Sequence, residues 1–87
     1  MPRVFIPPPL RSLTGDVEDV TVDAKNVRQV IDILDSQFPG IKSRLCDEEG
    51  LKPDLSVAVD GNVSSLGLLQ QVRENSEVHF LPAIGGG

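Results

Sequence analysis

The sequence has no tryptophan and no tyrosine, and its aromatic content is only 3% of 87 residues. Proteins that bind single-stranded nucleic acid stack bases on aromatic side chains, so this composition argues against that class. The eight lysines and arginines are scattered along the chain, and the formal net charge is −5. Neutralising phosphates requires a basic stripe, which the sequence lacks. We therefore expect no nucleic acid and no membrane among the partners, and an acidic chain that docks on a basic protein surface instead.

The sequence is also poor in residues that bind metals or form disulfides. Its single cysteine, Cys46, rules out an intramolecular disulfide. With no second cysteine or histidine pattern beside it, Cys46 is expected to be a partly buried structural thiol rather than a nucleophile. His79 is the one histidine, so no metal site is expected. Residues 1–9 contain no apolar run long enough for a signal peptide or a membrane span, and the expected location is the cytoplasm.

Short runs of β-branched and aromatic residues predict the strands. Proline cannot donate a hydrogen bond to a sheet ladder, so Pro7–Pro9 should end the first strand and Pro82 the last. Gly15-Asp16 and Asp60-Gly61 are typical turn pairs, and Val63 could open a short edge strand after the second of them. The predicted strands are 3–6, 17–22, 55–59 and 77–81.

One amphipathic helix lies between the second and third predicted strands. Its apolar residues fall on one stripe at helical spacing: Val27, Val30, Ile31, Leu34 and Phe38. Asn26 is a favourable N-cap, and Gln29 follows three residues later, as in a capping box. Pro39-Gly40 should end the helix. After it we expect one short helical turn over 41–45, a charged loop over 47–50 and a packed loop with a helical turn over 66–72.

A chain of 87 residues forms one small domain, and a single helix is too little to cover both faces of a sheet. The expected fold is therefore α+β, a β-grasp in which a mixed sheet packs on one main helix. The helix should contribute Val30, Ile31, Leu34 and Phe38 to a core shared with Val4, Ile6, Val57 and Val78. We expect this domain to span residues 1–84, with residues 85–87 as a flexible glycine tail.

The unusual feature of the sequence is Gly85-Gly86-Gly87 at its end. Glycine tails are often simply frayed. Here, however, the glycines follow a predicted strand and Pro82, so they could form a tip without side chains on a rigid base. The five residues after Pro82 could reach roughly 17 Å. Such a tip could enter a narrow channel in another protein, because any Cβ would collide with the channel walls. The carboxylate of Gly87 is unreactive until it is activated, for instance as an acyl-adenylate.

Several segments along the whole chain together resemble the MoaD/ThiS family of ubiquitin-like sulfur carriers. They are the first strand ending in proline, Leu10–Gly15, the capped helix from Asn26, Val57–Gly61 and the ending Leu81–Gly87. The Pro-Ala-Ile ending and the Leu-Thr-Gly loop are most similar to the carriers that feed cysteine synthase. Two positions depart from the common pattern: Gly85 stands where Ser, Thr or Ala is usual, and Glu74-Asn75 replaces an Asp-Gly turn.

The resemblance implies a function for Gly87. A ubiquitin-activating-type adenylyltransferase would use ATP to adenylate its carboxylate, which sulfur would then convert to a thiocarboxylate. The thiocarboxylate would donate sulfur to an accepting enzyme such as a cysteine synthase, with molybdopterin and thiamine biosynthesis as the other pathways of the family. The chain would then be a co-substrate of its partner enzymes rather than an enzyme, and would bind no cofactor itself. Two alternatives remain open: a ubiquitin-like modifier conjugated through Gly87, and a non-catalytic β-grasp interaction module.

Strand alternation also predicts a docking surface. If the valines of the strands face the helix, the residues between them face the other way. Those residues are Phe5, Ala58, His79 and Leu81, and with Pro82 and Ile84 at the start of the tail they form the candidate partner-binding set. The simpler interpretation is that they are scattered exposed apolar residues, which are common on protein surfaces.

Overall fold

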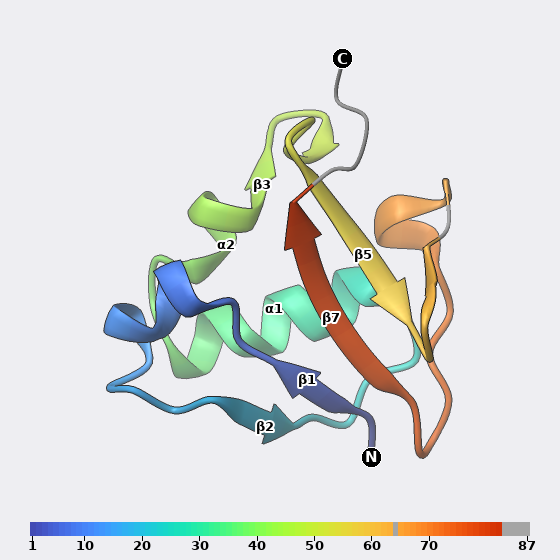
Figure 1. The fold of residues 1–87 in the computed structure, drawn as a ribbon, viewed down its shortest axis with the longest axis horizontal. Helices are drawn as coiled ribbons and strands as arrows, with labels where there is room; N and C mark the ends of the chain where they lie inside the picture. The colour runs from blue at the N-terminus through green and yellow to red at the C-terminus, as the bar shows by residue number, and fades with distance from the viewer. Residues whose placement is uncertain (64, 83–87) are drawn as a thin grey trace.

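The computed structural model describes residues 1–63 and 65–82 of the chain. Within them, five strands form one mixed sheet in the order β2-β1-β7-β5-β6, and helix α1 crosses one of its faces (Figure 1). This is the predicted α+β architecture of a β-grasp. The elements are β1 (Arg3–Phe5), η1 (Pro8–Leu13), β2 (Asp19–Thr21), α1 (Val27–Gln37), α2 (Ile41–Leu45), β3 (Cys46–Asp47), β4 (Gly50–Leu51), β5 (Leu55–Val59), β6 (Asn62–Val63), η2 (Gly67–Leu69) and β7 (Glu77–Pro82).

The last strand, β7, lies in the middle of the sheet. It runs parallel to β1, with Val4 opposite Val78, and antiparallel to β5, with Val57 opposite Phe80. The pairing with β1 stops at His79, whereas the pairing with β5 continues to Pro82. The first half of β7 is therefore paired with a strand on each side, whereas its last residues are paired with β5 alone.

Helix α1 begins as the sequence predicts. The Gln29 backbone N–H donates a 2.9 Å hydrogen bond to Oδ1 of Asn26. The return bond of a capping box would reach the N-cap residue, but the Gln29 side chain instead accepts from the N–H of Lys25, also at 2.9 Å. The cap thus satisfies two backbone donors at the start of the helix.

The end of α1 differs from the prediction at Phe38. The helix stops at Gln37, and Phe38 has φ −130° and ψ 81°, outside the helical region. The cause is Pro39, because its ring disfavours helical geometry in the residue before it. Phe38 is consequently only partly buried against the core, whereas Leu34 is completely buried. The expectation that Phe38 is a full member of the helix stripe was wrong.

Three other segments correct the sequence-based expectations. The segment 47–50, expected to be a loop, takes part in the β3–β4 hairpin, in which Cys46 pairs with Leu51. These strands have two residues each, too few for alternation to reveal. Strand β2 covers only Asp19–Thr21 of the expected 17–22. Pro82 does not stop β7 but is its last residue, opposite Leu55, at a strand end where a missing N–H is tolerated.

The core is aliphatic, as the composition requires. It joins α1, α2 and the inner face of the sheet, and its completely buried members include Val4, Val27, Val30, Leu34, Ile41, Leu45 and Val78. The predicted contact between the helix stripe and the strand valines is confirmed. No helix within the described ranges is long and apolar enough to cross a bilayer.

The turn between β5 and β6 is tied to the start of β7. Asp60 and Gly61 both have positive φ, 53° and 82°, as a two-residue hairpin turn of type I′ requires. The Asp60 carboxylate accepts hydrogen bonds from the N–H of Glu77 and the hydroxyl of Ser76, each at 2.9 Å. The pKa of Asp60 is lowered from its ordinary value, most by the hydrogen bond from the Glu77 backbone and next by the hydrogen bond from Ser76. These bonds fix where the central strand begins.

Candidate functional site

The sheet face opposite α1 carries a row of residues that crosses every strand. Residues opposite one another in a sheet point to the same face. The register therefore aligns one residue each from β2, β1, β7, β5 and β6: Asp19, Phe5, His79, Ala58 and Val63. We call this row, together with Leu81, the outer face. In Figure 1 the strands pass in front of α1, so this face is turned toward the viewer.

Phe5 and His79 form the centre of the outer face. Their rings stack with centroids 4.3 Å apart and planes 6° from parallel. The Arg3 guanidinium lies 5.0 Å from the Phe5 centroid, a cation–π distance, and its Nε donates a 2.6 Å hydrogen bond to Asp19. The contacts order the two rings relative to one another. Ordered, half-buried aromatic rings are suited to contact with a protein partner.

The other predicted docking residues differ in how much surface they offer. Leu81 is half-buried and Pro82 is exposed, both at the end of β7. Ala58 shares the face but is only 5% exposed between its neighbours, so it can offer little contact area. Ile84 and the tail residues Gly85, Gly86 and Gly87 lie outside the described residues, as does the predicted boundary between the domain and its tail.

Sequence reasoning missed two residues of this face, Asp19 and Val63. Val63 lies directly opposite Ala58 and is 57% exposed. Its membership depends on the two-residue turn at Asp60-Gly61, which sets the pairing of β6 with β5. The Asp-Gly signal was visible in the sequence, but the face that Val63 occupies follows only from the register.

His79 on the outer face forms no hydrogen bond with Glu77, whose Oε1 is 3.8 Å from Nε2. Across residues 1–63 and 65–82, no cluster of three or more histidine, cysteine or acidic side chains could hold a metal ion. What this face offers is contact area beside the end of β7.

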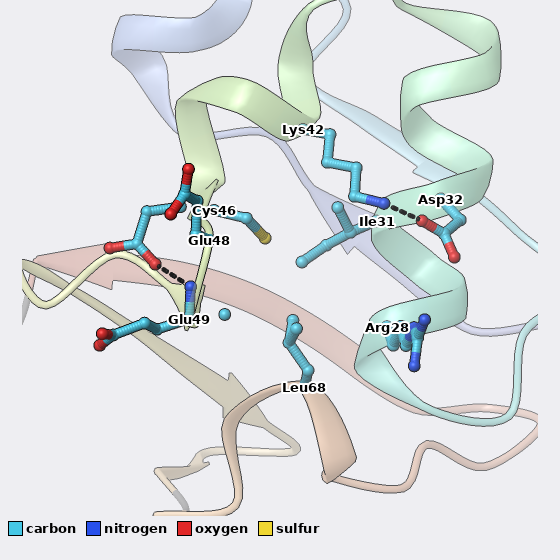
Figure 2. A pocket seen from close by; sticks show the side chains of 10 residues that line it. Arg28, Ile31, Asp32, Lys42, Cys46, Glu48, Glu49 and Leu68 are labelled. Carbon is cyan, nitrogen blue, oxygen red and sulfur yellow. Dashed lines mark hydrogen bonds and ion pairs between the residues drawn. The ribbon is translucent and has the colours of Figure 1, made fainter.

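A separate pocket lies on the helix side of the sheet, between α1, the β3–β4 hairpin and η2 (Figure 2). It encloses about 280 Å³, and the Cys46 side chain points into it toward Ile31. Burial raises the pKa of the Cys46 thiol, which favours the protonated form over the nucleophilic thiolate. Lys42 donates a 2.8 Å hydrogen bond to Asp32, which raises the pKa of Lys42. The cysteine therefore has the structural character that the sequence predicts.

Comparison with known proteins identifies relatives over the whole chain. The model of the ThiS family matches residues 4–87. A chain in the crystal structure of the BexX/CysO complex from Amycolatopsis orientalis is 35% identical, with a TM-score of 0.89 and complete coverage of both chains. CysO from Mycobacterium tuberculosis is 28% identical, with a TM-score of 0.87 and coverage of 97% of this chain and 100% of that one.

More distant structures share the fold. SAMP1 from Haloferax volcanii is 22% identical, with a TM-score of 0.71 and coverage of 99% of this chain and 98% of that one. No curated protein matches the sequence.

Proposed function

Because this chain belongs to the ThiS family, we propose that it is a sulfur carrier whose working group is the carboxylate of Gly87. The observation that carries the proposal is the extent of the family match, which continues through the glycines to residue 87. The likeness to two CysO proteins supports the same function. The described part of the molecule supports it as well, since the strand that precedes the tail is the central strand of the sheet.

The proposed chemistry exchanges one oxygen of Gly87 for sulfur in two steps. A carboxylate oxygen first attacks the α-phosphate of ATP in a partner enzyme, and pyrophosphate leaves. Hydrosulfide, or its equivalent from a donor, then attacks the acyl carbon, and AMP leaves. The product is a thiocarboxylate, whose sulfur is a far better nucleophile than the original oxygen. In this scheme the partner binds ATP, and the carrier is its co-substrate.

We further propose two kinds of partner: a ubiquitin-activating-type adenylyltransferase and a sulfur-accepting enzyme, with cysteine synthase as the leading candidate. The relative from Amycolatopsis orientalis was crystallised in a complex with BexX, so a carrier of this fold can dock on another protein. We propose the cytoplasm as the location of this chemistry, because sulfur at the thiol level persists where the environment is reducing.

The outer face is the proposed docking surface for these partners. We expect Phe5→Asp or Leu81→Asp to weaken binding to the adenylyltransferase by about 2 kcal/mol or more, because each replaces an apolar anchor by a charge. Isothermal titration calorimetry with the purified enzyme would measure the change. Leu69→Asp is the matched control, since Leu69 is 73% exposed on η2, away from this face. Unchanged affinity in both outer-face variants would mean that these residues are ordinary exposed apolar side chains.

The intact mass of the protein isolated from its native cells tests the proposed function directly. A fraction of the chains should show the mass increase that corresponds to replacing one oxygen by sulfur, and fragmentation should assign it to Gly87. Treatment with iodoacetamide should alkylate this species at the C-terminus, with Cys46→Ser removing the other alkylation site. If the chain instead occurs in covalent conjugates with lysines of other proteins, it is a modifier. Absence of both species would favour a plain interaction module.

A further inference from the structure

A second pocket lies between η1, the end of α2 and the start of β5. Its apolar lining consists of Pro7, Pro9, Leu10, Leu45 and Leu55. Leu10 and Leu45 belong to the buried core, so packing fixes this part of the wall. The pocket encloses about 200 Å³. Pockets that hold small molecules enclose roughly 300–1,000 Å³, so this one is better suited to a single aliphatic side chain of a protein partner.

The same pocket carries positive charge without a counter-charge. Arg44 and Lys52 both line it, and neither forms an ion pair with any residue of 1–63 or 65–82 within 4 Å. By contrast, Arg3 and Lys42 are paired with aspartates. Among the described residues that line the pocket, Asp54 is the one carboxylate. In a chain of net charge −5, this local excess of positive charge beside apolar surface matches a partner that is aliphatic and acidic.

The end of β7 adds a backbone acceptor on the side that faces β1. The Arg3 N–H donates to the Ser76 carbonyl at 2.8 Å, which sets the alternation of hydrogen bonds in this parallel ladder. The alternation turns the N–H and the carbonyl of Phe80 toward β1. The next donor along β1 would be residue 7, but Pro7 has no N–H. The parallel ladder therefore ends before the Phe80 carbonyl is paired.

Strand β5, on the other side of β7, does not supply the missing donor. The Asp60 N–H donates to the Glu77 carbonyl at 2.9 Å, so these two residues form a hydrogen-bonded pair. Hydrogen-bonded and non-hydrogen-bonded pairs alternate along an antiparallel ladder, and the pair of Phe80 with Val57 is consequently of the second kind. Within residues 1–63 and 65–82, neither ladder provides a donor for the Phe80 carbonyl.

The pocket and this carbonyl are at the same end of the sheet. Strand β7 lies between β1 and β5, and the end of β7 is beside the end of β1 and the start of β5 (Figure 1). Pro7, just beyond β1, and Leu55, the first residue of β5, both line the pocket. A partner that reacts with Gly87 must approach this end, because the chain continues from β7 toward Gly87.

We propose that this end of the sheet is a docking site for an extended segment of the adenylyltransferase. The segment inserts an aliphatic side chain into the pocket, places an acidic side chain near Arg44 and Lys52, and donates a backbone N–H to the Phe80 carbonyl, as in strand addition to a sheet edge. The proposal rests on the proposed function for the identity of the partner. Since the outer face is on the other side of the sheet, the enzyme would hold the end of β7 from both faces.

Charge reversal tests this site in ATP–pyrophosphate exchange, with the full chain as the varied substrate. Arg44→Glu combined with Lys52→Glu should raise KM about tenfold or more and leave kcat unchanged, because it repels the acidic segment without touching the reacting group. The matched control combines Lys25→Glu and Arg28→Glu at the start of α1, with the same change in net charge. At about 0.15 M salt, screening over roughly 8 Å should keep the KM of this control near the wild-type value.

Asp54→Asn should have the opposite effect. It removes the carboxylate that lines the pocket, so an acidic segment should bind more tightly and KM should fall. If the double glutamate variant fails to fold, Arg44→Gln with Lys52→Gln replaces it. Equal KM values for the Arg44/Lys52 variant and its control, or a KM that does not fall in Asp54→Asn, would overturn the proposal.

The backbone contact has its own measurement. When the adenylyltransferase is added to the isotope-labelled chain, the carbonyl ¹³C signal of Phe80 should move downfield, as expected when it accepts a hydrogen bond. The Val78 carbonyl is the matched control, because it already accepts within the parallel ladder. An unmoved Phe80 signal would overturn the proposal. A shift of this signal with chain concentration alone would also overturn it, because the occupant would then be a second copy of the chain.

These outcomes are distinct from a failure of the proposed function. Normal exchange with equal KM values in all variants would remove the docking site and leave Gly87 as the working group. No exchange with the wild-type chain would instead mean that Gly87 is not adenylated, and both proposals would fall.

Discussion

Deleting Gly86 and Gly87 is expected to abolish thiocarboxylate formation while the melting temperature stays almost unchanged. The reacting carboxylate must lie within near-attack distance of the α-phosphate of ATP, and a misplacement of about 1 Å can cost roughly 100-fold in rate. The deletion moves the carboxylate by two residues. Among residues 1–63 and 65–82, the last member of the core in the chain is Phe80, and we expect folding not to depend on the glycines. ATP–pyrophosphate exchange with the adenylyltransferase, together with a thermal melt, measures both effects.

Two further variants separate the effect of tail length on adenylation from the effect of side-chain bulk. One residue added after Gly87 moves the carboxylate by about 3.5 Å and should be equally damaging. Gly86→Val keeps the length and adds only side-chain bulk, so a large loss would show that the channel is narrow. Adenylation at a normal rate in the shortened or lengthened chain would show that Gly87 is not the working group.

The second large effect is expected in the core. Leu34→Ala should lower the free energy of unfolding by about 2–5 kcal/mol, because Leu34 is completely buried and its loss leaves a cavity. That is a large share of the roughly 5–15 kcal/mol by which small domains are stable. Urea denaturation followed by far-ultraviolet circular dichroism would measure it, with an unchanged slope as the check on two-state behaviour.

Phe38→Ala is the informative comparison for Leu34→Ala. The removed side chain is larger, but Phe38 is only partly buried at the end of α1. We therefore expect Phe38→Ala to lower the free energy of unfolding by less than Leu34→Ala does. From the apolar stripe in the sequence alone, the two residues would be expected to be equally buried. A greater cost for Phe38→Ala would contradict the position of the helix end.

The sequence alone was sufficient to predict the features that depend on neighbours along the chain. The apolar stripe of α1 follows from helical spacing. The Asn26 cap is equally local, because its side chain binds the backbone N–H of Gln29 only three residues later. The inner and outer faces of β1, β5 and β7 follow from alternation, so Phe5, His79 and Leu81 were placed on the correct side. The three final glycines are visible in the sequence, and their role as a reactive tail stays a prediction.

The tertiary structure decided the features that bring distant segments together. The stacking of Phe5 on His79 requires the parallel pairing of β1 with β7, which joins residues 74 positions apart in the chain. A pocket of about 200 Å³ combines residues from segments 7–10, 44–45 and 52–55, and no local pattern in the sequence predicts that these segments line one depression. Helical spacing and strand alternation report only which side of an element a residue occupies. Which elements meet depends on how all the apolar faces are buried at once, and that is a property of the folded chain as a whole.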